Sequence, residues 1–212
     1  MREGPEALLA VADVSRETIG KFEMFVALLR KWQRAENLIA PSTIDEIWTR
    51  HVADSAQLAV LFPEQRWMDL GSGGGFPGLV VALINARHVH LVESNRRKCA
   101  FLRAVIHETG APATVHEGRV EAVLASWSEP VDRVSARALA SLGELLTLSE
   151  PLLRQGTPAA LAKGAEYRRE IAEAERDWLL DIAVIPSRVG AGGAILDVRA
   201  ARRRPNQDKT RA

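Results

Sequence analysis

The sequence has few of the features that mark disulfide-rich, zinc-binding, secreted or membrane proteins. Cys99 is its only cysteine, which excludes an intramolecular disulfide and a zinc site built from several cysteines. The first residues lack the basic-then-apolar order of a signal peptide. No apolar run approaches the roughly 18 residues of a membrane span. These absences predict a cytoplasmic protein with no membrane contact.

A large excess of one charge is also missing. The net charge is +1, so no overall field predicts a polyanionic partner. Hydrophobic residues make up 47% and charged residues 26% of the chain, which is typical of a globular protein. The 212 residues are enough for one domain with an extension. The histidines show no metal-ligand spacing, so we expect no metal site.

The stretch from Trp67 to Ile84 restricts the function most, because it reads as a buried strand, a glycine turn and a helix start. Glycine lacks a Cβ, so its backbone can adopt positive φ and let a ligand approach closely. Pro77 suits a first helical turn. Free N–H groups at such a helix start favour a ligand that contains adenosine. The glycines of the turn are Gly71, Gly73, Gly74 and Gly75.

Two cofactor classes fit this turn. Gly73-x-Gly75-x-x-Gly78 matches the dinucleotide pattern, which is weak evidence by itself. Asp69-Leu-Gly-Ser-Gly-Gly-Gly, with an acid two positions before the first glycine, looks more like the first motif of S-adenosylmethionine methyltransferases. Glu93 follows at about the 20-residue spacing expected for a ribose-binding acid. We therefore favour S-adenosyl-L-methionine over a turn that only packs strand against helix.

Residues 1–62 read as a helical extension. Apolar residues recur at three- and four-residue steps from Ser15 to Leu38, which predicts an amphipathic helix. Pro41 would end it, and Ser42 would cap a second helix that ends before Pro63. Two helices bury little by themselves, so we expect the extension to cap the domain that follows.

Residues 63–200 alternate short apolar runs with helical segments, which predicts an α/β domain with a mainly parallel twisted sheet and helices on both faces. The last two predicted strands are close together and could form a hairpin at the sheet edge. The predicted strands are 66–70, 88–93, 113–116, 132–136, 159–163, 182–186 and 194–199. The predicted helices lie near 77–85, 95–109, 120–127, 141–153 and 165–179.

Ligands of such sheets bind outside the carboxyl ends of the strands. We therefore expect one crevice to be lined by the residues at or just past the predicted strand ends. These are Gly71, Glu93, His116, Arg137 and Lys163.

Two groups of basic residues are candidates for contact with phosphates. Residues 201–212 are basic, and we interpret them as a solvated tail, with a phosphate-contacting arm as the alternative. Arg30, Lys31 and Arg34 cluster at one predicted helix end. We expect them, with the tail, to form a patch beside the crevice.

Several blocks of the sequence resemble the bacterial RsmG (GidB) family, in the same order and spacing from about residue 25 to about residue 165. The first is Asp69-Leu-Gly-Ser-Gly-Gly-Gly-Phe-Pro-Gly, in which Phe-Pro after the glycines is distinctive. The others are Asn37-Leu38, Trp48-Thr-Arg-His51-Val-Ala-Asp54-Ser55, Leu91-Val-Glu93-Ser94-Asn95, Arg119-Val120-Glu121, Ser135-Ala-Arg137-Ala138 and Lys163-Gly164.

The resemblance implies a Rossmann-like class I methyltransferase that uses S-adenosyl-L-methionine to methylate N7 of one guanine in 16S rRNA. Its partner would be the 30S subunit or an assembly intermediate, and we expect a monomer. The resemblance assigns cofactor contacts to Gly71, Gly73, Phe76, Glu93, Ser94, Asn95, Val120, Glu121 and Arg137. It assigns substrate contacts to Arg137, Lys163 and Asn37.

The chemistry of this acceptor is simple. Guanine N7 carries an in-plane lone pair and needs no deprotonation before it attacks a methyl group. We therefore name no general base, and we interpret His51 and Asp54 as a bonded pair that ties the extension to the sheet.

Other functions remain as alternatives. The acceptor could be another RNA or a small molecule, because the sheet domain alone does not specify it. An NAD(P) oxidoreductase is less favoured, because the sequence has no plausible hydride-site acid such as a Tyr-x-x-x-Lys pair. A non-catalytic RNA-binding protein would bind RNA without binding the cofactor.

Overall fold

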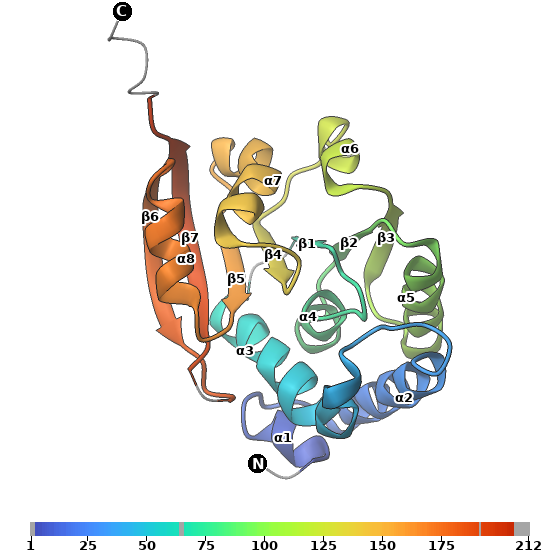
Figure 1. Ribbon diagram of the computed structural model, residues 1–212. Helices are drawn as coiled ribbons and strands as arrows, with labels where there is room; N and C mark the ends of the chain where they lie inside the picture. The colour runs from blue at the N-terminus through green and yellow to red at the C-terminus, as the bar shows by residue number, and fades with distance from the viewer. Residues whose placement is uncertain (1–2, 64–65, 191, 206–212) are drawn as a thin grey trace, which may run out of the picture.

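The computed structural model describes residues 3–63, 66–190 and 192–205, and it shows a sheet of seven strands flanked by helices (Figure 1). The strand order is β3-β2-β1-β4-β5-β7-β6. Strands β1 to β5 are parallel, whereas β7 runs antiparallel to both β5 and β6. The strands are β1 Trp67–Leu70, β2 Val89–Glu93, β3 Ala113–Glu117, β4 Arg133–Arg137, β5 Ala159–Lys163, β6 Trp178–Pro186 and β7 Ala194–Arg203.

Helices cover the sheet and form the N-terminal segment. The N-terminal helices are α1 Pro5–Leu9, α2 Arg16–Trp32, the 3₁₀-helix η1 Pro41–Glu46, the π-helix η2 Trp48–Ala53 and α3 Asp54–Leu61. The helices that connect the strands are α4 Gly78–Asn85, α5 Arg96–Thr109, α6 Val120–Ala125, α7 Leu142–Arg154 and α8 Tyr167–Ala174. The α/β class and the helical N-terminal segment predicted from the sequence are confirmed.

The core consists of two buried clusters, one on each face of the sheet. The first joins the N-terminal helices to α4 and α5, since α2 packs on α5 and α3 packs on α4. Phe25 of α2 stacks on Phe76 of the glycine turn, with ring centroids 5.1 Å apart. The second cluster lies among α6, α7, α8 and the sheet. The extension therefore shares its core with the cofactor turn, which fixes the two relative to each other.

The predicted strands up to residue 163 agree with the observed strands to within one residue at each end. The edge hairpin is also present, as β6 and β7. The helix predicted for 165–179 is wrong at its end, because β6 begins at Trp178. In this strand Trp178, Leu180 and Ile182 pack on the core, and the residues between them face outward. That alternation is the period of a strand and not of a helix.

Strand β7 continues to Arg203, so Arg202 and Arg203 pair within the sheet. The Arg203 guanidinium lies 4.4 Å from the centre of the Trp178 ring. The end of β7 and helix α2 lie at opposite ends of the molecule (Figure 1). The part of the basic end that the structure describes therefore does not join the patch expected at α2. Residues 206–212 lie outside the described residues.

The helix predicted for 15–38 ends at Trp32. Beyond it, the side chain of Gln33 forms hydrogen bonds with the backbone of Leu38 and Ile39, so these two residues do not continue the helix. Its Oε1 accepts from the amides of Leu38 and Ile39, at 3.0 and 3.1 Å. Its Nε2 donates to the carbonyl of Ile39 at 2.8 Å. A single amide side chain thus folds the chain back after α2 and positions residues 37–40.

Ser42 does not cap an α-helix as predicted. Pro41 takes the first position of η1 and Ala40 precedes it, without a side-chain cap. The chain then passes from the 3₁₀-helix through the π-helix into α3. Single π-turns of this kind often occur at functional sites, and this one contains His51.

Candidate functional site

The glycine turn after β1 depends on backbone conformations that favour glycine. Gly71, Gly73 and Gly75 have φ values of +67°, +52° and +88°. A Cβ on Gly78 would lie 2.8 Å from the Asp69 carboxylate, so glycine also permits the close contact between α4 and β1. The sequence predicted the turn and the need for glycine at positions 71, 73 and 75. Gly74, the fourth predicted glycine, has no positive φ, and the contact at Gly78 was not predicted.

Asp69, in β1, is fully buried and stabilises the turn through hydrogen bonds. Its carboxylate accepts hydrogen bonds from Ser135 Oγ at 2.7 Å and from the amide of Gly78 at 3.2 Å. Burial raises the pKa of Asp69 to about 6, and these hydrogen bonds oppose the rise. Asp69 therefore ties β1, β4 and the start of α4 together.

Glu93 connects the end of β2 to the glycine turn. Its Oε2 accepts from the amide of Gly73 at 2.9 Å, and its Oε1 accepts from the amide of Asn95 at 2.7 Å. Each carboxylate oxygen keeps a second lone pair. Asn95 caps α5, where its Oδ1 accepts from the amides of Arg97 and Lys98.

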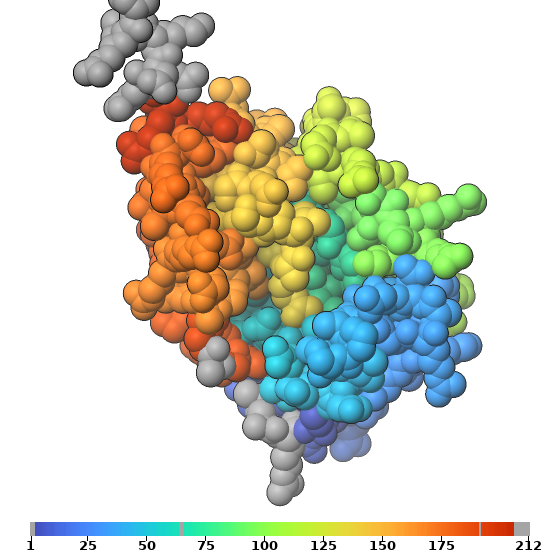
Figure 2. All heavy atoms as spheres, viewed as in Figure 1, coloured from blue at the N-terminus to red at the C-terminus, as the bar shows by residue number. Residues whose placement is uncertain are grey.

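A cavity of about 650 Å³ opens above this turn. Figure 2 shows the face hollowed between the N-terminal segment, in blue and cyan, and the yellow segment that follows β4. The segment set by Gln33 forms one wall, and Leu38 O lies 3.0 Å from where a Cβ on Gly74 would sit. The wall includes Gly71, Gly73, Phe76, Glu93, Ser94, Val120, Glu121, Arg137 and Asn37.

Three residues expected at this site do not line this cavity: Asn95, His116 and Lys163, the last of which lines a second cavity described below. Asn95 is not part of the described wall, although Glu93 binds its amide. His116 faces away from the crevice: its Nε2 lies 3.1 Å from His90 Nδ1, and its ring packs edge-on against Trp127. His116 is the penultimate residue of β3, and its ring faces His90 of β2 and Trp127, which follows α6.

Arg137, at the end of β4, makes the contacts that join the sheet to the N-terminal segment. Its Nη2 lies 2.7 Å from Nδ1 of His51, and its Nη1 donates to the carbonyl of Arg50 at 3.0 Å. Nη1 is also 3.5 Å from Oδ2 of Asp54. The guanidinium lies 5.2 Å from the centre of the Phe76 ring. In the described chain, His51 and Asp54 each contact Arg137, so the predicted direct pair between them is wrong.

These contacts fix the tautomer of His51. Arginine can only donate, so Nδ1 of His51 accepts and Nε2 carries the proton. Nε2 lies 2.7 Å from Thr43 Oγ1, which in turn donates to the carbonyl of Ala40 at 2.8 Å. Burial, and then the charge of Arg137, lower the pKa of His51 to about 3. His51 is therefore a neutral relay between β4 and η1.

A second cavity of about 950 Å³ adjoins the first. Both are lined by His51, Arg137, Ala138 and Leu139, so these residues form a shared wall. Leu139 packs against Gly71, since a Cβ there would lie 2.6 Å from its Cδ1. The second cavity is otherwise bounded by η1, η2, the end of β5 and the β6–β7 connection.

Lys163 lines the second cavity, but its ammonium group already forms an ion pair within the protein. Its Nζ lies 2.6 Å from Glu170 Oε2 and donates to the carbonyl of Ala140 at 2.8 Å. Glu170 also accepts from the amide of Leu142 at 2.7 Å. Lys163 therefore fixes the segment after Leu139, a structural role that no local sequence pattern indicates.

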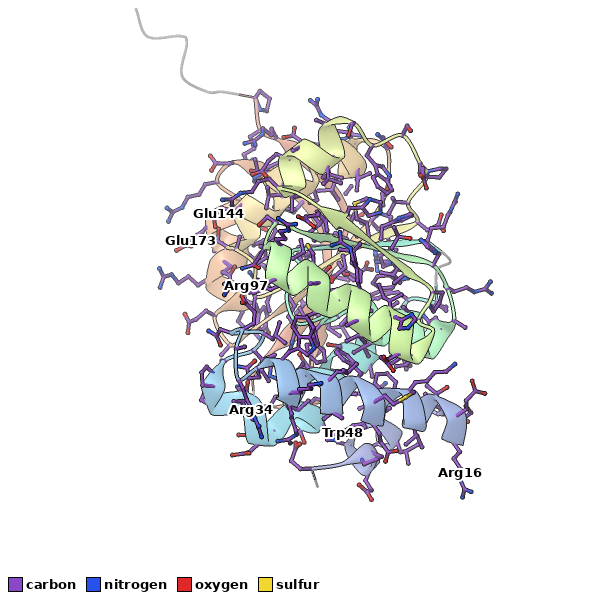
Figure 3. All side chains as sticks on the ribbon, turned by 90° about the vertical axis from the view of Figure 1, so that its right-hand side faces the viewer. Arg16, Arg34, Trp48, Arg97, Glu144 and Glu173 are labelled. Carbon is purple, nitrogen blue, oxygen red and sulfur yellow. The ribbon has the colours of Figure 1, made fainter. Side chains whose placement is uncertain are left out.

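In a third cavity, of about 620 Å³, the charged side chains of the lining are mainly acidic. Figure 3 shows Glu144 and Glu173 projecting on the same side of the molecule. Arg203 is the cation among the described residues that line this cavity. Its acidic residues are Glu121, Glu144, Glu170, Glu173 and Asp177. Such a surface repels phosphates.

Two further properties concern the described residues alone. No helix among them is long and apolar enough to cross a membrane. No group of three or more histidine, cysteine, aspartate or glutamate side chains among them could hold a metal ion.

Comparison with known proteins identifies the family. Residues 18–193 match the family model GidB, described as rRNA small subunit methyltransferase G. The chain belongs to this family. It is 47% identical over 201 residues to the ribosomal RNA small subunit methyltransferase G of Methylorubrum populi, covering 92% of this chain and 95% of the relative. It is 49% identical over 189 residues to that of Rhodospirillum centenum, covering 88% and 86%.

Solved structures confirm the class I Rossmann-like methyltransferase fold of this GidB family member. A putative O-methyltransferase from Klebsiella pneumoniae superposes with a TM-score of 0.59 at 13% identity, covering 92% of this chain and 94% of the other. A methyltransferase from Geobacter sulfurreducens superposes with a TM-score of 0.56 at 15% identity, covering 90% and 99%. At these identities the likeness concerns the fold.

Proposed function

We propose that the protein transfers the methyl group of S-adenosyl-L-methionine to N7 of one guanine in 16S rRNA. The observation that carries this proposal is the pair of adjoining cavities with the shared wall at Arg137, within a chain of the rRNA small subunit methyltransferase G family. One cavity suits a nucleoside cofactor and the other an acceptor base. A substrate of this kind implies a cytoplasmic location. We expect the protein to act as a monomer.

The residues around the glycine turn fit the cofactor. Its adenosine ribose would take the remaining lone pairs of Glu93, whose carboxylate is already held in place by Gly73 and Asn95. Val120 and Glu121 line the same cavity and would flank the adenine. Gly71 and Gly73 leave room for the methionyl part. A solved O-methyltransferase from Bacillus cereus with this fold holds S-adenosylhomocysteine, which supports the assignment.

The bound cofactor supplies an activated methyl group, so the protein needs only to align and shield the reactants. Guanine N7 attacks with its own lone pair, so no side chain has to remove a proton. Alignment of the two reactants can supply a large part of the rate acceleration. His51, Arg137 and Leu139 lie where the two cavities meet, so they would set the approach of N7 to the methyl group.

The second cavity suits an RNA base better than the third. It is lined by Arg50, Arg137 and Lys163 together with three acids, so its charges are balanced. The third cavity is mainly acidic and would repel the phosphates of RNA. A base that reaches the second cavity would have to leave its stack, as is usual for enzymes that modify bases.

Arg30, Lys31 and Arg34 are candidates for contact with the RNA backbone. All three are exposed at the end of α2, next to the start of α5. Figure 3 shows Arg34 and Arg97 on the same side of the molecule. Phosphate contacts of this type position RNA without reading its sequence.

Transfer of labelled methyl from S-adenosylmethionine to 30S particles, and to free 16S RNA, from cells that lack the modification tests the proposal. We expect label in the ribosomal substrate, and its loss with Gly71→Arg. Cofactor binding without labelling of either substrate would leave another RNA or a small molecule as the acceptor. Failure to bind the cofactor would contradict the methyltransferase assignment, and a redox change with NAD(P) would favour the oxidoreductase.

A further inference from the structure

We infer that Arg137 and Asp54 together recognise the guanine: Arg137 donates to O6, and Asp54 accepts from N1–H and the exocyclic amino group. This inference rests on the proposed function and assigns the groups that read the acceptor base. It gives Asp54 a role in substrate recognition beyond its structural contacts with Arg137 and Gln57.

The first step concerns where the base must lie. The methyl group has to pass from the cofactor cavity to the second cavity beside the residues that line both. The accepting atom of the base must therefore face those residues. Arg137 belongs to the shared wall, whereas Asp54 lines the second cavity and not the first. Around the rim of guanine the order of groups is N7, O6, N1–H and N2. A base with N7 at the wall therefore presents O6 near Arg137 and its N1 and N2 edge farther in, toward Asp54.

The second step concerns hydrogen-bonding capacity. A guanidinium has five N–H donors, and the contacts of Arg137 with Arg50 O, Asp54 and His51 use three of them. The guanidinium therefore keeps donor capacity for O6. Its side chain is 16% exposed, so it is within reach of a ligand in the cavity.

The Asp54 carboxylate also has acceptor capacity. Its Oδ1 accepts from Gln57 Nε2 at 3.2 Å, and its Oδ2 is 3.5 Å from Arg137 Nη1. The second distance is well beyond the about 2.7–2.9 Å of a strong charge-assisted hydrogen bond. A carboxylate offers about four lone-pair sites. Two parallel N–H groups, as on guanine, are the partners that suit it.

The other acids of the second cavity are less suitable. Glu170 already binds Lys163 Nζ and the amide of Leu142 at short distances. Glu46 is half-exposed and faces Arg50 at 3.8 Å. Asp54 is instead mostly buried and is held by Gln57, whose Nε2 also donates to the Asp54 carbonyl and to Ser187 Oγ. Its carboxylate is thus fixed before a base arrives.

Arg137 and Asp54 would discriminate against adenine, and Asp54 would stabilise the charge that forms during methyl transfer. Adenine presents a donor where guanine has O6 and an acceptor where guanine has N1–H, so both contacts would be lost. Positive charge reaches the purine as the N7–carbon bond forms and the sulfur–carbon bond breaks. Asp54 would stabilise that charge through N1–H and the amino group, and it balances the charge of Arg137.

The test compares 30S particles whose 16S RNA carries guanine or inosine at the acceptor position, since inosine lacks the exocyclic amino group. For the wild-type protein we expect kcat/KM to fall with inosine on the order of 10- to 100-fold, the value of a hydrogen bond to a charged group. Asp54→Asn and Asp54→Ala should lower kcat/KM with guanine by a similar factor and bring the two substrates to within about threefold of each other. Asp54→Glu, which keeps the carboxylate, should retain part of the preference.

Asp13→Asn is the matched control, because Asp13 is exposed in the loop before α2. It should keep the wild-type preference for guanine. Calorimetry with S-adenosylhomocysteine should give unchanged affinity in every variant, which shows that the cofactor site is intact. A preference for guanine that is undiminished in Asp54→Asn and Asp54→Ala would overturn the assignment of Asp54. Wild-type protein that labels neither substrate would overturn the proposed function itself, and this inference with it.

Discussion

Arg137 at the end of β4 and His51 in the π-helix η2 are joined by a 2.7 Å hydrogen bond between Nη2 and Nδ1. Both residues line both cavities. The N-terminal segment thus supplies His51, one of the residues of the wall that both cavities share. Its role therefore goes beyond covering the sheet, because the site is incomplete without it.

Arg137→Lys should destabilise the fold and lower activity. An ammonium group cannot reach His51, Arg50 O and Asp54 at the same time, so buried polar groups would be left unpaired. We expect the free energy of unfolding to fall by about 1–3 kcal/mol in urea titrations. Arg154→Lys is the control, because Arg154 is an exposed helix residue in an i,i+4 pair. Its loss should stay within about 0.5 kcal/mol, and equal losses for the two variants would contradict the role of Arg137.

His51 should make the protein less stable as the pH falls. The unfolded imidazole binds a proton below its ordinary pKa of 6.5, whereas the folded one, with a pKa of about 3, does not. The unfolded state therefore binds more protons between these values, and stability decreases as the pH falls through this window. His51→Gln offers an acceptor to Arg137 and a donor to Thr43 without titrating. In urea unfolding from pH 7.5 to 4, acidification should lower the free energy of unfolding of the wild type relative to that of the variant.

The comparison has to be made as a difference between variant and wild type, because Asp69 acts with the opposite sign. Its pKa is raised from 3.8 to about 6, so the folded state binds the extra proton in that window and gains stability on acidification. Asp69 is present in both proteins and cancels in the difference. Identical slopes for wild type and His51→Gln would refute the neutral relay.

Glu93→Gln should weaken cofactor binding. The amide cannot accept from both Gly73 and Asn95, and it would lose a charge-assisted bond to the ribose. We expect the Kd for S-adenosylhomocysteine, measured by calorimetry, to rise on the order of 10- to 100-fold. Glu108→Gln, at an exposed position of α5, is the control and should leave Kd unchanged. Wild-type affinity in Glu93→Gln would place the ribose elsewhere.

Replacing Arg30, Lys31 and Arg34 with glutamate should weaken binding to the ribosomal substrate and reduce its salt dependence, because phosphate contacts are lost. Cofactor affinity should be unchanged, since these side chains do not line the cofactor cavity. Glutamate at Arg154, Arg168 and Arg176 is the matched control, because these arginines are exposed elsewhere on the surface. Methylation of 30S particles at the wild-type rate by the first variant would eliminate the patch.

The sequence predicted well those features that depend on local patterns. Buried parallel strands are short continuous apolar runs, and so β5 was predicted with its correct bounds. The glycine turn was predicted because few residues tolerate positive φ. Glu93 was expected near a ribose from its spacing, although its bonds to Gly73 and Asn95 were not.

Other features depend on residues that are distant in the sequence. Gln33 ends α2 because its side chain meets the backbone of residues 38 and 39, which helical periodicity does not indicate. His51 and Asp54 have helical spacing, but a cation from β4, more than eighty residues away, is the partner of both. The start of β6 was assigned to a helix because its apolar residues also fit a helical pattern at that length.

The most direct test of the account is the identity of the nucleoside that carries the label after methyl transfer to 30S particles lacking the modification. The account predicts one labelled nucleoside, 7-methylguanosine, from one position in 16S rRNA. It also predicts that Asp54→Asn lowers the yield without changing the product. Label on another atom of the base, on the ribose or on many positions would contradict it.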